Sequence, residues 1–518
     1  MPKQKTDDLL KLVASLNRAE KRHFRLFVKR NQQADADILF LQLFDILERT
    51  GEYDEAYLLK RIEGIKKSQL SNLKAHLYKQ LLTSLRLLNR NKDEEITLRE
   101  NLDYARILYN KGLYRQSLDV LEKVKKWALE SEAHTIALEI AQFEKLIEGQ
   151  YITRSLAGRA DELSEECDDL TQKIAYANGF SNLSLRLYGR YLQDGLVKSD
   201  EEAAAIQLFF HDNLPTTAFD DLDFWGKVYY CQSYTWLHLI RQEYPQSYRY
   251  TQRWVDLFRD NPKMIEVNAP LYLKGMHNHL ANLFSMWQYD KFIAELQHLD
   301  LFPHQYDLTN NVNVAGLYHL YQFDHQIRRH YMEGTFSEGL GLVPQLMEVI
   351  EDNRYNWDDH RHMVFYYRIA CLYFGSGDND TAIDYLNLII NQRSPSYRSD
   401  IQAYARILSL ICHFEMGNVQ LVEYQVKSVY RYLAKVEHLQ QVQQVIFRFL
   451  RRIPRIREAD LRDEFIKLKG KLDEVAKLPY ESRPFTYLDI PSWLESKIEG
   501  VSVQEVIRRQ FEEQRQLA

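Results

Sequence analysis

Apolar side chains recur at steps of three and four residues along most of the chain, a spacing that places them on one face of an α-helix. The pattern is clearest at residues 366–390. One face there consists of Tyr366, Ile369, Ala370 and Tyr373, and a second of Ala382, Leu386 and Ile389. Glycine and Asx residues between the two faces tolerate the backbone angles of a helix end and a turn. The pattern therefore predicts two helices joined by a tight turn.

The residue types at these positions resemble one tetratricopeptide unit. The matching features are an aromatic at Tyr366, a large apolar residue at Ile369, a small residue at Ala370, an aromatic at Tyr373, a turn glycine at Gly377 and a packing residue at Ala382. The resemblance covers residues 95–435 and implies an all-α, right-handed solenoid of antiparallel helical hairpins. It also implies non-enzymatic recognition of a protein or peptide segment. The modules at both ends indicate a bacterial family with this layout.

Turn signals equivalent to Gly377 recur through residues 93–435. They fall at Gly112, near Ile152, and at Gly195, Gln242, Trp287, Gly334, Gly377 and Gly417. The intervals of roughly 40–47 residues exceed the tetratricopeptide repeat of about 34, so about eight hairpins with longer helices or links are expected. After Gly334, the residues Gly339, Gly341 and Pro344 predict either a hinge or a late start of the second helix.

Residues 1–92 are expected to form a separate helical module. Helices are predicted at residues 7–16, 17–29, 38–49, 54–62 and 68–89, with caps at Asn17 with Glu20 and at Ser68. This module has 19 basic and 11 acidic residues, a net charge of +8, whereas the whole chain has −6 and the remainder therefore −14. Such an asymmetry supports a distinct module.

The long helix of this module is predicted to carry a stripe of basic residues that faces the solvent. The basic patch consists of Lys60, Arg61, Lys66, Lys67, Lys79, Arg86 and Arg90. Lys and Arg along one face suit the phosphates of nucleic acid. The same stripe would serve equally as a solvated helix face or as a patch for an acidic protein, and no Asn, Gln or Arg cluster marks a turn that reads a DNA groove.

Residues 436–518 are expected to form a helical cap over the open end of the repeats, which such arrays need for solubility. Helices are predicted at residues 437–453 and 458–478, followed by an extended segment at residues 479–491. Capping boxes at Ser492 with Glu495 and at Ser502 with Glu505 predict two further helices.

Composition favours a cytoplasmic helical protein. Nineteen glycines, twelve prolines and no long β-branched alternation argue against strands. The four cysteines form no CxxC pair, which is typical of reduced core residues. No signal peptide and no membrane span is expected.

Catalytic and cofactor-binding signatures are absent from the sequence, so no enzyme activity and no cofactor is expected. There is no phosphate loop, GxGxxG, GxSxG or HExxH motif. The histidines at His277 and His279 are two residues apart, which on a helix points them in different directions, so no metal site is expected. The acidic run at residues 165–169 is interpreted as a solvated helix face.

The concave face of the hairpin stack is the predicted binding surface. Offsets of about ten, six and three residues before each turn select the groove residues Arg106, Tyr109, Gln232, Trp236, His277, Phe284, Asp324, Arg328, Tyr331, Tyr367 and Phe374. Aromatic residues mixed with Arg are typical of binding surfaces. If the register were shifted by one residue, the same aromatics would be core.

Two functions remain open from the sequence. The first is a scaffold that holds a protein or peptide segment in the groove. The alternative is a regulator whose residues 1–92 bind nucleic acid while the repeats sense a partner or ligand, a layout similar to peptide-sensing regulators with a helical effector module. Neither reading involves a membrane, and neither specifies the partner or the oligomeric state.

Overall fold

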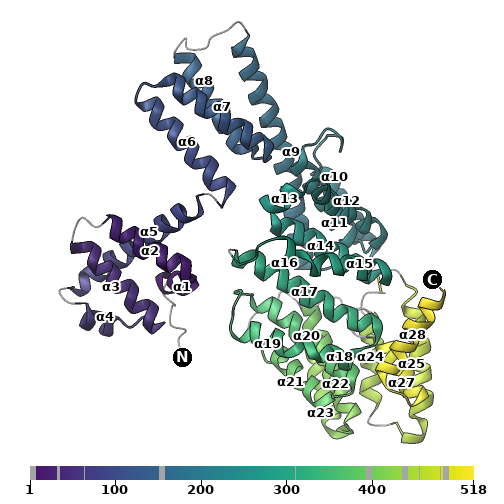
Figure 1. Ribbon diagram of the computed structural model, residues 1–518. Helices are drawn as coiled ribbons and strands as arrows, with labels where there is room; N and C mark the ends of the chain where they lie inside the picture. The colour runs from purple at the N-terminus through teal and green to yellow at the C-terminus, as the bar shows by residue number, and fades with distance from the viewer. Residues whose placement is uncertain are drawn as a thin grey trace. The chain divides into compact units, whose positions relative to one another are not determined.

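The computed structural model describes residues 8–31, 35–62, 65–90, 92–150, 158–309, 311–392, 399–433, 441–453, 456–478, 480–481 and 489–517. Within these ranges every regular element is a helix, which confirms the all-α class (Figure 1). The chain divides into two compact units, Met1–Thr171 and Gln172–Ala518. Domain boundaries near residues 92 and 435 stay predictions.

The first helices of unit 1 share one apolar core around Phe24, Phe44 and Leu77. They are α1 (Asp8–Ser15), α2 (Arg18–Asn31), α3 (Asp35–Thr50), α4 (Glu55–Arg61) and α5 (Lys67–Asn89). The predicted cap of α2 is confirmed, because the Asn17 N–H donates to Glu20 Oε2 at 2.8 Å and the Glu20 N–H donates to Asn17 Oδ1 at 3.0 Å.

The predicted cap of α5 at Ser68 is wrong. The helix already begins at Lys67, and the Lys66 N–H donates to Gln69 Oε1 at 2.9 Å. Because Gln69 follows Lys66 by three residues, its side chain reaches back to the first free N–H of the helix, as in a capping box.

The rest of unit 1 contains α6 (Glu94–Asn110), α7 (Tyr114–Glu130), α8 (His134–Gln150) and the start of α9 (Arg159–Asp194), which share one apolar core. A buried cation joins three of them. Lys125 of α7 contacts Glu144 of α8 at 2.6 Å and Glu166 of α9 at 2.7 Å. A buried charge requires such pairing, so this contact fixes the register of the three helices.

In unit 2, after the end of α9, come α10 (Asp200–Asp212), α11 (Phe224–Ile240), α12 (Tyr244–Asp260), α13 (Pro262–Val267), α14 (Ala269–Ser285), α15 (Tyr289–Asp300), α16 (Phe302–Gln305), α17 (Val312–Glu333), α18 (Phe336–Gly339), α19 (Val343–Glu351), α20 (Asp359–Ser376), α21 (Asn379–Ile390), α22 (Ser399–Glu415) and α23 (Val419–Leu433). Many of these helices pack against the next helix in the chain, as α11 does on α12, α14 on α15, α20 on α21 and α22 on α23. The first helices of successive hairpins also touch, as α14 touches α17 and α17 touches α20.

The hairpin α20–α21 shows how the local sequence specifies the fold. Asp358 accepts from the Arg361 N–H at 2.8 Å and starts α20, Gly377 ends it with a left-handed φ of 94°, and Asp378 accepts from the Thr381 N–H to start α21. The apolar faces then close on each other, with Ala370 and Leu386 fully buried.

The predicted turn positions are confirmed wherever the structure describes them. Positive φ angles occur at Gly112, Gly195, Gln242, Trp287, Gly334, Gly377 and Gly417. The turn near Ile152 lies outside the described residues. At Gln242 and Trp287 a side chain occupies a conformation that usually favours glycine.

Two elements differ from a regular repeat. Helix α9 runs unbroken through residues where the sequence predicts parts of two separate units, since Gly179 and Gly189 are both helical. After Gly334 the structure has the late helix start: α18 leads into the 3₁₀ segment η1 (Leu340–Leu342), and α19 begins with Pro344 in its first turn, where a proline is tolerated.

The C-terminal residues partly continue the stack and partly lie along its turns. Their elements are α24 (Gln441–Arg452), η3 (Glu458–Asp460), α25 (Leu461–Val475), α27 (Ile490–Glu499) and α28 (Val503–Leu517). Helix α24 packs on α23, whereas α28 packs on α17 and α20, with the Ser337 N–H donating to Gln504 at 2.8 Å. The role of residues 436–518 as a cap stays a prediction.

The capping box at Ser502 and Glu505 is confirmed, but Ser492 does not cap α27. Asp489 does so, accepting from the Ser492 N–H at 3.0 Å, because the helix begins three residues earlier than a cap at Ser492 would give. Most of the segment predicted to be extended, residues 479–491, lies outside the described residues. None of the described helices has the length and apolar composition needed to cross a membrane.

Candidate functional site: a groove in unit 2

Unit 2 contains a groove of about 650 Å³. Its walls come mainly from α11, α14, α17 and α20, the first helices of four successive hairpins, with additions from the end of α9 and from α12 and α22. Its aromatic lining comprises Tyr188, Tyr191, Tyr229, Trp236, Tyr244, Phe284, Tyr321, Tyr331, Phe365 and Tyr367. Apolar surface interrupted by a few polar groups is the usual character of a ligand site.

Helix α17 supplies the middle of the groove. Leu317, Tyr321, Asp324, Arg328 and Tyr331 follow one another at steps of four, three, four and three residues, so they lie on one face of the helix. This face is held against α20, because the Tyr331 hydroxyl donates to the backbone carbonyl of Arg368 at 2.6 Å. The groove is therefore built on rigid helices rather than on loops.

The charge of the groove is positive. Among its lining residues Lys274, Arg328, Arg361 and Arg368 are basic and Asp324 is the one acidic residue. Asp324 accepts from Arg328 Nε at 2.9 Å and pairs with Arg368 at 2.5 Å. Burial raises the pKa of this carboxyl, but the two guanidinium groups outweigh burial and hold its pKa well below the ordinary value.

Two of these cations also contact aromatic rings. The Arg328 guanidinium lies 4.8 Å from the centroid of the Phe284 ring, and Lys274 Nζ lies 5.6 Å from that of Tyr188. Cations beside aromatic faces are held by the ring quadrupole. Burial lowers the pKa of Lys274, so its charge is easier to lose than that of an exposed lysine.

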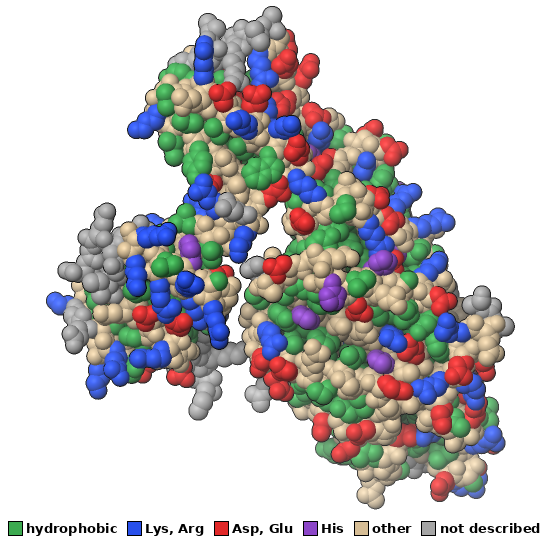
Figure 2. Space-filling view, in the orientation of Figure 1, with side chains coloured by type: hydrophobic (Ala, Val, Ile, Leu, Met, Phe, Trp, Pro, Cys, Tyr) green, Lys and Arg blue, Asp and Glu red, His purple; other side chains and the backbone are tan. Residues whose placement is uncertain are grey.

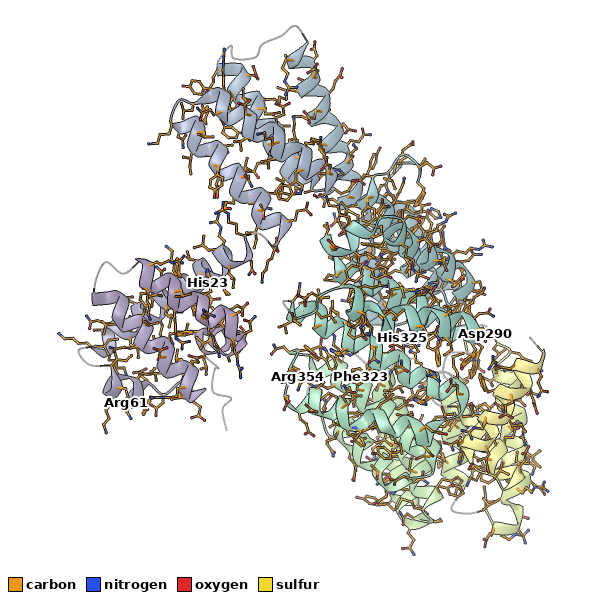
Figure 3. The ribbon with its side chains drawn as sticks, viewed as in Figure 1. His23, Arg61, Asp290, Phe323, His325 and Arg354 are labelled. Carbon is orange, nitrogen blue, oxygen red and sulfur yellow. The ribbon has the colours of Figure 1, made fainter. Side chains whose placement is uncertain are left out.

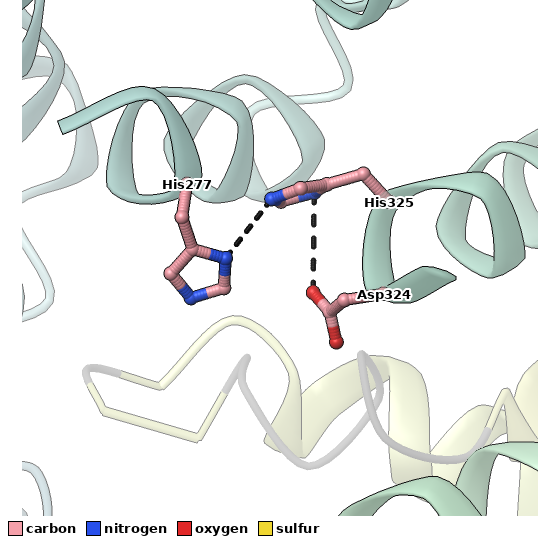
Figure 4. A group of neighbouring side chains, drawn as sticks. All are labelled: His277, Asp324 and His325. Atoms are coloured by element: carbon pink, nitrogen blue, oxygen red, sulfur yellow. Dashed lines mark hydrogen bonds and ion pairs between the residues drawn. The ribbon is translucent and has the colours of Figure 1, made fainter. Parts of the chain in front are cut away.

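A pair of histidines lies beside Asp324 (Figure 4). His277 Nδ1 and His325 Nε2 are 3.0 Å apart, and His325 Nδ1 is 3.9 Å from Asp324 Oδ2. His325, labelled in Figure 3, is fully buried in unit 2. Burial lowers the pKa of His277 to about 4 and that of His325 well below its ordinary value, so both rings are neutral at pH 7.

In unit 2 the ring nitrogens of these histidines and the Asp324 carboxylate are the described groups that could hold a metal ion, since their ligand atoms lie within 4.8 Å of one another. Arg328 and Arg368 already compensate the carboxylate and bring two positive charges next to it. Those charges oppose a cation at this position. The pair acts here as a hydrogen-bonded contact between α14 and α17.

Seven of the residues predicted for the groove line this one cavity: Trp236, His277, Phe284, Asp324, Arg328, Tyr331 and Tyr367. Gln232 and Phe374 are buried at 4% and 6% exposure and do not line it. Arg106 and Tyr109 belong to unit 1, where Arg106 lies over the Phe143 ring and Tyr109 donates to Gln150. That the seven bind a partner stays a prediction.

The sequence prediction missed other residues that line the groove, most of them on the same helices. The residues not foreseen include Tyr188, Lys274, Asn278, Asn282, Tyr321, Arg361 and Arg368. Helix α17 has 22 residues and α20 has 18. In both helices the lining begins about two turns before the first position that the offsets select, because those offsets were taken from a shorter tetratricopeptide unit. Continuing the three- and four-residue steps backwards from Asp324 would have found Tyr321 and Leu317.

The predicted basic patch of unit 1 is solvent-exposed at all seven positions. Three of its cations are nevertheless paired: Lys67 with Glu55 at 2.8 Å, Arg86 with Asp103 at 3.3 Å, and Arg90 with Glu100 at 2.5 Å. Because these partners come from α4 and α6, the local charge count along α5 could not reveal them.

No protein-family model, no curated protein and no solved structure matches this chain.

Proposed function

We propose that this chain is a non-enzymatic scaffold of tetratricopeptide-like helical hairpins, and that the groove of unit 2 binds a segment of a partner protein or a peptide. The observation that carries the proposal is the groove itself, a cavity of about 650 Å³ formed by the first helices of four consecutive hairpins. Turns at regular intervals and packing between neighbouring hairpins support the solenoid.

The lining favours a segment that carries both carboxylate and apolar side chains. Asp324 offsets one of the four basic residues of the groove, which leaves an excess of positive charge for a bound acid. Arginine pairs with carboxylates through two parallel hydrogen bonds, and aromatic walls bury apolar side chains. Asn278 and Asn282 add amide groups that can bond to a peptide backbone.

Affinity selection from a library of random 12-residue peptides tests this function on the full chain. Peptides enriched in Asp or Glu together with apolar residues are expected. Arg361 lines the groove, its side chain is 38% exposed, and its ion-pair partner Asp358 is 3.8 Å away, so Arg361→Glu reverses a charge without breaking a buried contact. This change should weaken binding at least tenfold, about 1.4 kcal/mol.

Arg249→Glu is the matched control, since Arg249 is exposed in unit 2 and does not line the groove. Affinity of the selected peptides should stay within about twofold of the unchanged chain. Peptides that bind the Arg361→Glu chain as tightly as the unchanged chain would place their site elsewhere.

A further inference from the structure

Helix α2 is the most strongly basic element of unit 1. Its 14 residues include Arg18, Lys21, Arg22, Arg25, Lys29 and Arg30, against the single acidic residue Glu20. Like charges at this density repel one another within a helix unless they find partners outside it. Which of them are paired therefore decides what the helix can bind.

Two of these cations are neutralised by the neighbouring helix. Lys21 pairs with Glu48 of α3 at 3.5 Å, and Arg25 pairs with Asp45 at 2.9 Å and also with Glu48. Both basic side chains are half-buried on the side of α2 that faces α3. These ion pairs hold α2 against α3, and they neutralise Asp45 and Glu48.

The other four cations are exposed and pair with no acidic group among the described residues: Arg18, Arg22, Lys29 and Arg30. Arg18, Arg22 and Lys29 follow one another at four and seven residues, so they form one stripe, bordered on the side of α3 by the paired Arg25. Arg30 is also exposed and points about 100° away from Lys29 around the helix. From Arg18 to Arg30 the helix rises about 18 Å. Figure 2 shows Lys and Arg side chains gathered on the N-terminal part of unit 1.

The apolar face of α2 is packed into the core of unit 1. Phe24 and Val28 are buried at 1% and 2% exposure in the core shared with α3 and α5. His23 Nδ1 lies 2.9 Å from Ser84 Oγ, which joins α2 to α5. With its apolar side packed, α2 cannot insert into a lipid interface, because binding there requires a free apolar face.

We propose that the exposed face of α2 formed by Arg18, Arg22, Lys29 and Arg30 binds the phosphate backbone of double-stranded nucleic acid. A rise of about 18 Å is long enough to bring the cations against several successive phosphates of one strand. Arginine, three of the four cations, binds phosphate with two parallel hydrogen bonds. Protein interfaces are centred on apolar anchors, whereas Leu26 is the one large apolar side chain exposed on this helix.

This proposal moves the nucleic-acid surface from α5 to α2 and is independent of the groove in unit 2. Three of the seven cations of the patch predicted along α4 and α5 pair with Glu55, Glu100 and Asp103, whereas the four exposed cations of α2 pair with no acidic group among the described residues. Contacts to phosphate alone carry no sequence information, so binding should not depend on base sequence.

Fluorescence anisotropy of labelled 24-base-pair DNA and RNA duplexes with the full chain tests the proposal between 50 and 200 mM NaCl. Binding should weaken with added salt at a log–log slope of about −3 to −4, as expected for four phosphate contacts. The two duplexes distinguish DNA from RNA as the source of the phosphates. Arg18→Gln/Arg22→Gln/Lys29→Gln should weaken binding at least tenfold at 50 mM NaCl.

The control variant Lys67→Gln/Arg86→Gln/Arg90→Gln removes the same charge from cations that are already paired, and its affinity should stay within about threefold of that of the unchanged chain. Equal losses in both variants would mean that binding follows net charge and would overturn the proposal. So would an absence of duplex binding, or α2-dependent binding to anionic phospholipid vesicles alone. If the triple variant fails to fold, Arg22→Gln should reduce the slope by about 1, and an unchanged slope overturns the proposal.

Discussion

The buried histidines of unit 2 give the structure a defined response to acid. Burial lowers the pKa of His277 and of His279 to about 4, below the unfolded value of 6.5. Between pH 6.5 and 4 the unfolded chain therefore binds protons that the folded chain does not. Stability should fall as the pH is lowered through this window, by about 1.4 kcal/mol per pH unit for each histidine.

Replacing His279 shows how much this one histidine contributes to the pH dependence of stability. His279 is 1% exposed and its Nδ1 lies 3.2 Å from Thr251 Oγ1, a contact that glutamine can keep. In His279→Gln, the free energy of unfolding measured in urea should decrease less steeply between pH 6.5 and 4, by about 1.4 kcal/mol per pH unit. An unchanged pH dependence would mean that His279 titrates normally.

Asp324 should be the most costly single residue to neutralise in the groove. It is 6% exposed and compensates both Arg328 and Arg368. Asp324→Asn leaves these charges without a counter-ion and should reduce the free energy of unfolding by about 3–5 kcal/mol. Asp290→Asn, at a side chain 78% exposed and 3.4 Å from Arg515, should cost less than about 1 kcal/mol in the same urea titration. Similar losses in the two variants would contradict this assignment.

The groove residues show how far single positions can be predicted. Trp236, His277 and Arg328 were placed by counting back from a turn, because helix periodicity carries the register of one face along the chain. Gln232 and Phe374 follow the same count but do not line the groove, since the packing between helices that shapes a cavity is not encoded in the spacing.

At the scale of elements, two turn glycines allow the cost of a left-handed backbone to be separated from the cost of a steric clash with a neighbouring helix. Gly334 has a φ of 63°, and a Cβ there would lie 2.5 Å from the backbone nitrogen of Arg508 in α28. Gly377 has a φ of 94° and no atom within 4 Å of such a Cβ. Alanine at either position pays the cost of a left-handed conformation, about 1 kcal/mol, but only at Gly334 must α28 also move.

Gly334→Ala should therefore lower the free energy of unfolding by about 1–3 kcal/mol more than Gly377→Ala, measured by urea denaturation. Equal losses would indicate that α28 does not pack on this turn. The test is specific to the C-terminal residues because α28 is separated in sequence from Gly334 by α18 to α27.

Turns were the most predictable elements, whereas contacts between distant elements were not. A helix end needs a residue that tolerates positive φ, and this need is visible in the local sequence at Gly112, Gly377 and Gly417. The packing of α28 on α17, by contrast, depends on long-range contacts such as that of Ser337 with Gln504. The ion pair between Arg86 of α5 and Asp103 of α6 was missed for the same reason.

At the scale of the whole molecule, the two units present different chemistry. Unit 1 exposes uncompensated cations on α2, and unit 2 contains a groove with aromatic walls and an excess of positive charge. A chain that binds nucleic acid through unit 1 and a partner through unit 2 would correspond to the regulator that the sequence offers as the alternative to a simple scaffold. The two activities are separable, since Arg361→Glu and the α2 variant should each remove one and leave the other.

Hydrogen–deuterium exchange of the full chain with and without a selected acidic peptide tests the proposed groove most directly. The amides of α14, α17 and α20 should gain protection when the peptide binds, and those of α15 and α21, the second helices of their hairpins, should change little. Protection of α15 and α21 without change in α14, α17 and α20 would contradict binding in the groove.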